Sequence, residues 1–153
     1  MPAAITTAPN AARPVTTDNV GFLLAKASQR WNELLYERFV ARGFGEVRPA
    51  YGSILVPLFE EDGLRMGELA ERAQLSKQTM TTMVRLLERA CLVVRERDDR
   101  DGRAFRIHLT DRAREFQPVA GEVLAELEGL VGQALTQRES TALQRALKGV
   151  IAL

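Results

Sequence analysis

The sequence of 153 residues contains only one cysteine and one histidine. A single cysteine excludes an internal disulfide and is typical of a reducing, cytoplasmic compartment. These two residues are also too few for the cysteine and histidine sets of zinc sites. Neither of the glycine-rich nucleotide-binding patterns occurs, and paired catalytic groups are missing. We therefore expect a cytoplasmic protein that needs no metal or other cofactor and is not an enzyme.

Long apolar runs and a large net charge are absent as well. No run of about 18 apolar residues occurs, so we expect no membrane span. Residues 1–17 are rich in Ala, Thr and Pro and lack the pattern of a signal peptide, which predicts a flexible tail. The net charge of +1 is weak support for a nucleic-acid partner. However, seven arginines and five acidic residues crowd into residues 95–114, which favours a local basic edge.

Apolar residues at helical spacing predict four helices around a central segment. They cover residues 18–42, 49–60, 111–134 and the stretch that follows Thr136. Asp18 or Thr17 can cap the first helix, and Thr110 or Asp111 the third. Thr136 and Glu139 form the capping-box pattern that opens the last helix.

The central segment begins with two short helices separated by a tight break. Ser76 is suited to cap the second of these helices, which we expect to run from Ser76 to about Ala90. Its apolar side chains are expected to face the core: Met80, Met83, Val84 and Leu87. Its other face offers an amide, hydroxyls and cations, which suit base edges and phosphates. An ordinary solvated helix face is the alternative, but a short helix, a turn and then this helix is typical of helix-turn-helix modules.

A hairpin is predicted after the helices. Residues 92–97 and 105–109 form its strands, and the tip, residues 98–103, mixes Asp with Arg. Gly102 is expected to take the positive φ that a hairpin tip often needs. One Arg can be braced by an Asp while another projects toward a minor groove. The alternative is a polar turn with weak surface ion pairs.

Two stretches, ELAERAQLSKQTMTTMVRLLERACLV and RERDDRDGRAFRIHLTDRARE, resemble the MarR family of winged helix-turn-helix transcriptional regulators. The family's wing commonly carries D-x-R-D-x-R, here Asp98, Arg100, Asp101 and Arg103. The family often has Gly in place of Cys91 and Arg in place of Thr82. The resemblance implies a mainly α fold with a small β-hairpin wing, a major-groove helix that starts at Ser76, and Arg103 at the wing tip. The candidate DNA-binding residues are Ser76, Lys77, Gln78, Thr79, Thr81, Thr82, Arg85, Arg100 and Arg103.

The predicted organisation has four parts. Residues 1–17 are the tail, 18–60 the N-terminal dimerisation and effector helices, 61–110 the DNA-binding region, and 111–153 the C-terminal dimerisation helices. The first and last two helices carry long apolar stripes that no further domain covers, so we expect a homodimer. Two copies can read a pseudo-palindromic operator in double-stranded DNA. Packing of these stripes within a monomer is the alternative.

By resemblance, a small-molecule effector binds in a pocket bordered by the first, second and fifth helices. The available side chains are Trp31, Tyr36, Arg38, Tyr51 and Phe59. Arg38 can meet a carboxylate, which favours an aromatic acid, although core or dimer packing can also explain each residue. We expect Cys91 to be buried and inert and His108 to lie on the surface.

The sequence therefore predicts a ligand-responsive repressor that binds specific DNA. A winged-helix module that serves protein–protein assembly without specific DNA binding is the alternative function.

Overall fold

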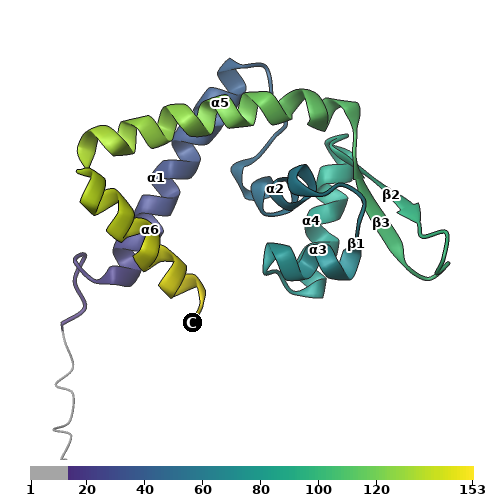
Figure 1. Cartoon of the computed structure of the whole chain (residues 1–153), viewed down its shortest axis with the longest axis horizontal. Coiled ribbons are helices and arrows are strands. Elements are labelled where there is room, and N and C mark those ends of the chain that lie inside the picture. Colours follow the sequence, from purple (N-terminus) through teal and green to yellow (C-terminus); the bar gives the residue numbers. More distant parts are fainter. Residues whose placement is uncertain (1–13) are drawn as a thin grey trace, which may run out of the picture. The chain divides into compact units, whose positions relative to one another are not determined.

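The computed structural model describes residues 14–153, and it is mainly helical with one small sheet, as predicted (Figure 1). The helices are α1 (Val20–Ala41), the 3-10 helix η1 (Pro49–Tyr51), α2 (Gly52–Glu60), α3 (Met66–Ala73), α4 (Lys77–Arg89), α5 (Asp111–Ala134) and α6 (Gln137–Ile151). The strands are β1 (Leu64–Arg65), β2 (Val93–Arg97) and β3 (Phe105–Leu109). Most of the predicted tail lies outside the described residues.

The first part of α1 belongs to a separate compact unit that ends at Trp31, and residues 32–153 form the second unit. The helix α1 is capped by Asn19, because the Asn19 side-chain oxygen accepts a 2.8 Å hydrogen bond from the Phe22 N–H. The predicted caps, Thr17 and Asp18, were therefore wrong by one or two residues. No described helix combines the length and the apolar character that crossing a membrane requires.

The sheet of the second unit is antiparallel, in the order β1-β3-β2. The two-residue strand β1 was not predicted, because two residues are too few to show an alternating pattern. Ile107 of β3 is fully buried and lies opposite Leu64 of β1. The largest buried side chains of the core come from α2, α3, α4, the residue before β2, β3 and α5: Ile54, Leu55, Leu58, Leu69, Met80, Leu87, Leu92, Ile107 and Leu127.

The end of α4 corrects one prediction about Cys91. This cysteine has a left-handed backbone, with φ of 57°, and its side chain is exposed rather than buried. The next two residues, Leu92 and Val93, are buried. The left-handed residue turns the chain from the helix into β2, and the Thr110 hydroxyl donates a 2.6 Å hydrogen bond to the Cys91 carbonyl.

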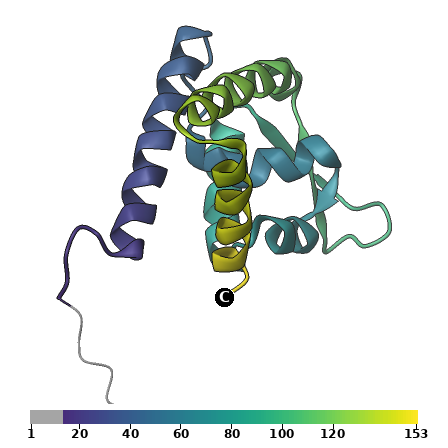
Figure 2. The same ribbon diagram turned by 60° about the vertical axis from the view of Figure 1, so that its left-hand side comes forward.

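The helices α5 and α6 follow the predicted bounds. Thr110 caps α5, and Thr136 with Glu139 forms the predicted capping box of α6. Figures 1 and 2 show that α6 turns away from the end of α5. The helix α6 buries no side chain, and its apolar face stays open along Leu143, Leu147, Val150 and Ile151. Within the second unit, two ion pairs join α5 to the end of α1 and the residue after it: Arg38–Glu126 (2.7 Å) and Arg42–Glu122 (2.6 Å).

Candidate nucleic-acid interface

The helix α4 presents a polar stripe to solvent. Met80, Val84 and Leu87 are buried on its inner side, so residues spaced by three and four on the opposite side are exposed. This outer stripe consists of Gln78, Thr82, Arg85 and Arg89, with Lys77 at its start. Arg89 was not among the predicted residues, although its spacing of four from Arg85 could have placed it there.

The hydroxyls of α4 are largely occupied by local hydrogen bonds. Ser76 accepts the Thr79 N–H at 3.1 Å, as predicted for the cap, and its hydroxyl donates to the Thr79 hydroxyl at 2.9 Å. Thr81 and Thr82 donate to the carbonyls of Lys77 and Gln78, one turn earlier. By contrast, four exposed side chains of α4 make no hydrogen bond or ion pair within the described part of the chain: Lys77, Gln78, Arg85 and Arg89. These four side chains are available to a ligand.

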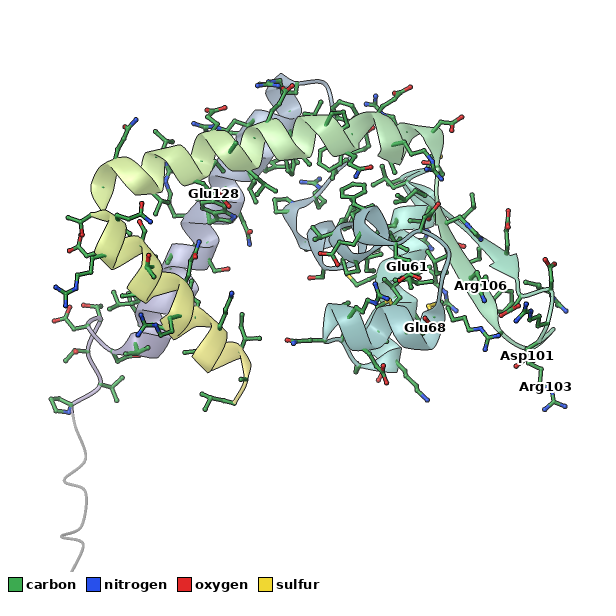
Figure 3. The ribbon with its side chains drawn as sticks, in the orientation of Figure 1. Glu61, Glu68, Asp101, Arg103, Arg106 and Glu128 are labelled. Atoms are coloured by element: carbon green, nitrogen blue, oxygen red, sulfur yellow. The ribbon has the colours of Figure 1, made fainter. Side chains whose placement is uncertain are left out.

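The tip of the β2–β3 hairpin is built from two consecutive Asx turns. The Asp98 carboxylate accepts the Arg100 N–H at 3.0 Å, and the Asp101 carboxylate accepts the Arg103 N–H at 3.1 Å. Each aspartate thus fixes the backbone of the arginine two residues later and leaves its guanidinium in solvent. Figure 3 shows Asp101 and Arg103 at the far end of the hairpin.

Gly102 does not take the positive φ that the sequence suggested, since the described glycines with positive φ are Gly43 and Gly63. The two Asx turns reverse the chain instead, and the Asp98 N–H closes the tip with a 2.9 Å bond to the Ala104 carbonyl.

A buried carboxylate anchors the hairpin to the rest of the unit. The Asp98 side chain is 3% exposed and lies 2.6 Å from the Arg65 guanidinium and 3.4 Å from that of Arg106. The Arg100 N–H, followed by the charges of Arg106 and Arg65, lowers the pKa of Asp98 against the opposing effect of burial. We had expected arginines of the tip to brace the hairpin. The bracing arginines instead come from β1 and β3, which no local pattern reveals.

Comparisons with known proteins fit this arrangement. Residues 49–105 match the family model described as the MarR family. This segment, which holds α4 and most of the hairpin, is thus similar to the MarR family. A curated relative is the transcriptional regulator SarZ of Staphylococcus epidermidis, 30% identical over 70 residues, which are 46% of this chain and 47% of SarZ. The chain thus spans about half the length of this relative.

Two solved structures share the fold of this winged helix and its flanking helices. The PcaV regulator of Streptomyces coelicolor, solved with its natural ligand, is 22% identical with a TM-score of 0.77, over 92% of this chain and 98% of PcaV. The repressor CouR, solved on a 23-mer DNA duplex, is 23% identical with a TM-score of 0.75, over 91% and 99% of the two chains.

A small apolar cavity borders this winged helix at the place expected for an effector. Residues of α1, the loop before η1, η1, α2 and α5 line a cavity of about 80 Å³: Leu35, Phe39, Val47, Arg48, Pro49, Gly52, Leu55, Val56, Phe59, Phe116, Ala120 and Leu124. Of the five predicted effector residues, only Phe59 lines it.

The other predicted effector residues have different surroundings. The Tyr36 hydroxyl donates to the Gly45 carbonyl at 3.1 Å, and Arg38 pairs with Glu126. Tyr51 is half-buried in η1, and Trp31 is half-buried at the end of the N-terminal unit. Arg48 was missed: it lines the cavity, and its guanidinium lies 4.6 Å from the centre of the Tyr36 ring.

Proposed function

We propose that the protein is a sequence-specific DNA-binding transcriptional regulator, active as a homodimer. The observation that carries this proposal is the pairing of a helix with unengaged Lys77, Gln78 and Arg85 and a hairpin that holds Arg100 and Arg103 in solvent. A helix of this kind reads base edges in the major groove, while an arginine at a narrow tip suits the minor groove. The DNA duplex bound to CouR supports the same use of the fold.

The proposed homodimer follows from the open face of α6. Four large apolar side chains of this helix are between 38% and 63% exposed: Leu143, Leu147, Val150 and Ile151. A second copy of the chain can cover this face, and the two winged helices can then meet two half-sites of a pseudo-palindrome.

We further propose that the protein represses transcription and is released by a small aromatic acid. Three phenylalanines in the apolar cavity, Phe39, Phe59 and Phe116, suit an aromatic ring. Arg48 at the cavity is better placed for the carboxylate than Arg38, because Arg38 already pairs with Glu126. The names of two similar proteins, the repressor CouR and the ligand-bound regulator PcaV, support this proposal.

A duplex that spans the region upstream of the coding sequence tests the proposal. In fluorescence anisotropy, the protein should bind this duplex at least about a thousandfold more tightly than shuffled DNA. Gln78→Ala and Arg103→Ala should each weaken specific binding by about 1–3 kcal/mol. If both variants bind as the wild type does, or if the wild type does not distinguish the two duplexes, the alternative of a protein-assembly module takes precedence.

A further inference from the structure

Two arginines lie side by side at the base of the wing. Arg65 of β1 and Arg106 of β3 are direct partners in the antiparallel register, so both side chains project from the same face of the sheet. Like charges at such positions ordinarily repel one another. Here the carboxylate of Asp98 lies between them, 2.6 Å from Arg65 and 3.4 Å from Arg106, and holds the two guanidiniums together.

This arrangement leaves positive charge and hydrogen-bond donors unused. The Asp98 carboxylate can balance only one of the two guanidiniums. Glu96, the partner of Arg106 on β2, lies with its carboxylate 3.4 Å from Nε2 of His108. Both arginine side chains remain 38% exposed, whereas Asp98 is 3% exposed. Arg106 also donates to the Gly63 carbonyl at 2.8 Å, but Arg65 has no other partner in the described part of the chain. Since a guanidinium carries five N–H donors, several of them stay available to an oxyanion.

The position of Arg65 and Arg106 in the fold indicates which oxyanion they can bind. Arg65 directly precedes α3, and Figure 3 shows Arg106 on the sheet between α3, where Glu68 lies, and the wing tip with Arg103. In a duplex, the sugar–phosphate backbone is the boundary between a major groove and the adjacent minor groove. The helix α3 is the first helix of the helix-turn-helix, which crosses this backbone. A surface between α3 and a minor-groove wing therefore meets phosphates.

We propose that Arg65 and Arg106 form a binding site for the phosphodiester backbone of duplex DNA, with Asp98 as the residue that positions both. This inference rests on the proposed DNA-binding function and adds a contact outside α4 and the wing tip. Guanidiniums suit phosphate because two parallel N–H groups can meet two of its oxygens. Their ion pairs with Asp98 restrict the side chains in advance, which lowers the entropic cost of binding.

Arg65→Gln is the most direct test, because Arg106 also holds the Gly63 carbonyl. The affinity for a fluorescein-labelled duplex of shuffled sequence is measured against salt concentration. Each lost phosphate contact should lower the slope of log affinity against log salt by about 0.9. The weakening should be equal on shuffled and upstream DNA, since phosphate contacts carry no sequence information.

Arg72→Gln serves as the matched control. Arg72 lies near the other end of α3, is 40% exposed, and pairs with Glu61 at 2.5 Å. The Arg72→Gln variant therefore loses the same charge as Arg65→Gln and a similar ion pair. The proposal expects the salt slope of this variant to stay closer to the wild-type slope. Equal slopes for wild type, Arg65→Gln and Arg72→Gln overturn the phosphate site but leave the DNA-binding function intact. A wild type that binds no duplex overturns both.

Thermal melting monitored by circular dichroism shows whether Arg65→Gln folds. If this variant unfolds, a second measurement on the wild type tests the proposal. In ¹⁵N-labelled wild type, the Nε–H resonances of Arg65 and Arg106 should shift when the shuffled duplex is added, while that of Arg72 stays in place. Shifts confined to α4 and the wing tip overturn the proposal.

Discussion

At the scale of single residues, Cys91 carries a conformational strain that glycine would relieve. Its φ of 57° lies in the left-handed region, which costs an L-residue roughly 1–2 kcal/mol. The exposed thiol contributes little burial in return. We expect Cys91→Gly to be about 0.5–1 kcal/mol more stable than Cys91→Ala, because both lose the thiol and only glycine relieves the strain. Urea unfolding of the two variants measures the difference, and a more stable alanine variant would contradict this account.

Asp98 links the stability of the wing to pH. The pKa of its carboxyl is lowered in the folded protein, chiefly by the Arg100 N–H, so the folded state favours the ionised form. The stabilisation is therefore complete above the pKa of the unfolded chain and is lost as pH falls through that value toward the folded pKa. Asp98→Asn should be less stable at neutral pH and should show a shallower loss of stability below about pH 4. Acid unfolding monitored by circular dichroism checks this, and parallel curves for variant and wild type would count against it.

At the scale of elements, the two Asx turns explain why aspartate precedes arginine in the proposed DNA interface. Asp101 repels phosphate, yet it orders the tip through the 3.1 Å bond from the Arg103 N–H. Asp101→Asn keeps this acceptor and removes the charge, while Asp101→Ala removes both. We expect the alanine variant to bind DNA about 0.5–1.5 kcal/mol more weakly than the asparagine variant, because the loop that carries Arg103 must then be ordered on binding. Anisotropy titrations compare them, and equal affinities would show that the turn is dispensable.

Local pattern predicts the elements of this protein better than their contacts. The spacing of Met80, Val84 and Leu87 and the cap at Ser76 were enough to place α4, because both signals lie within the helix itself. The partners of Asp98 were missed because Arg65 and Arg106 approach it only after β1 and β3 pair.

Two further errors arose from the same limitation. Cys91 was expected to be buried because its neighbours are apolar, but its left-handed backbone turns it outward. Phe59 lines the apolar cavity, and Arg48 was overlooked because only the fold brings it to the same place. Nonlocal geometry therefore limited the site prediction more than the fold prediction.

At the scale of the whole molecule, the open face of α6 predicts that assembly and DNA binding are lost together. Leu147→Glu places a charge in the proposed dimer interface, where burying it without a partner costs several kcal/mol. We expect monomers in sedimentation velocity and a loss of specific DNA binding, while the α-helical circular dichroism signal persists. Thr141→Glu adds the same charge on the opposite side of α6 and should remain dimeric. A dimeric, DNA-binding Leu147→Glu would place the interface elsewhere.

The size of the apolar cavity limits how an effector can enter it and release the protein from DNA, as proposed. Its volume of about 80 Å³ is smaller than the roughly 150 Å³ cavity that accommodates benzene. An aromatic acid must therefore widen the space between α2 and α5, and it can shift the protein only if it binds the widened state more tightly. Phe59→Leu enlarges the cavity in advance and should strengthen the binding of benzoate or salicylate by roughly tenfold or less, a gain of up to 1.4 kcal/mol.

Calorimetry measures that affinity, and anisotropy follows the release of upstream DNA. If Phe59→Leu improves binding of the acid, less acid should release the DNA, because the same widening then links the two sites. Arg48→Gln, added to the Phe59→Leu variant, distinguishes binding of the carboxylate from binding of the ring. The double variant should bind the acid and its uncharged amide with equal affinity. A Phe59→Leu protein that binds the acid more tightly but keeps its DNA at every acid concentration would show that this cavity is not coupled to the interface.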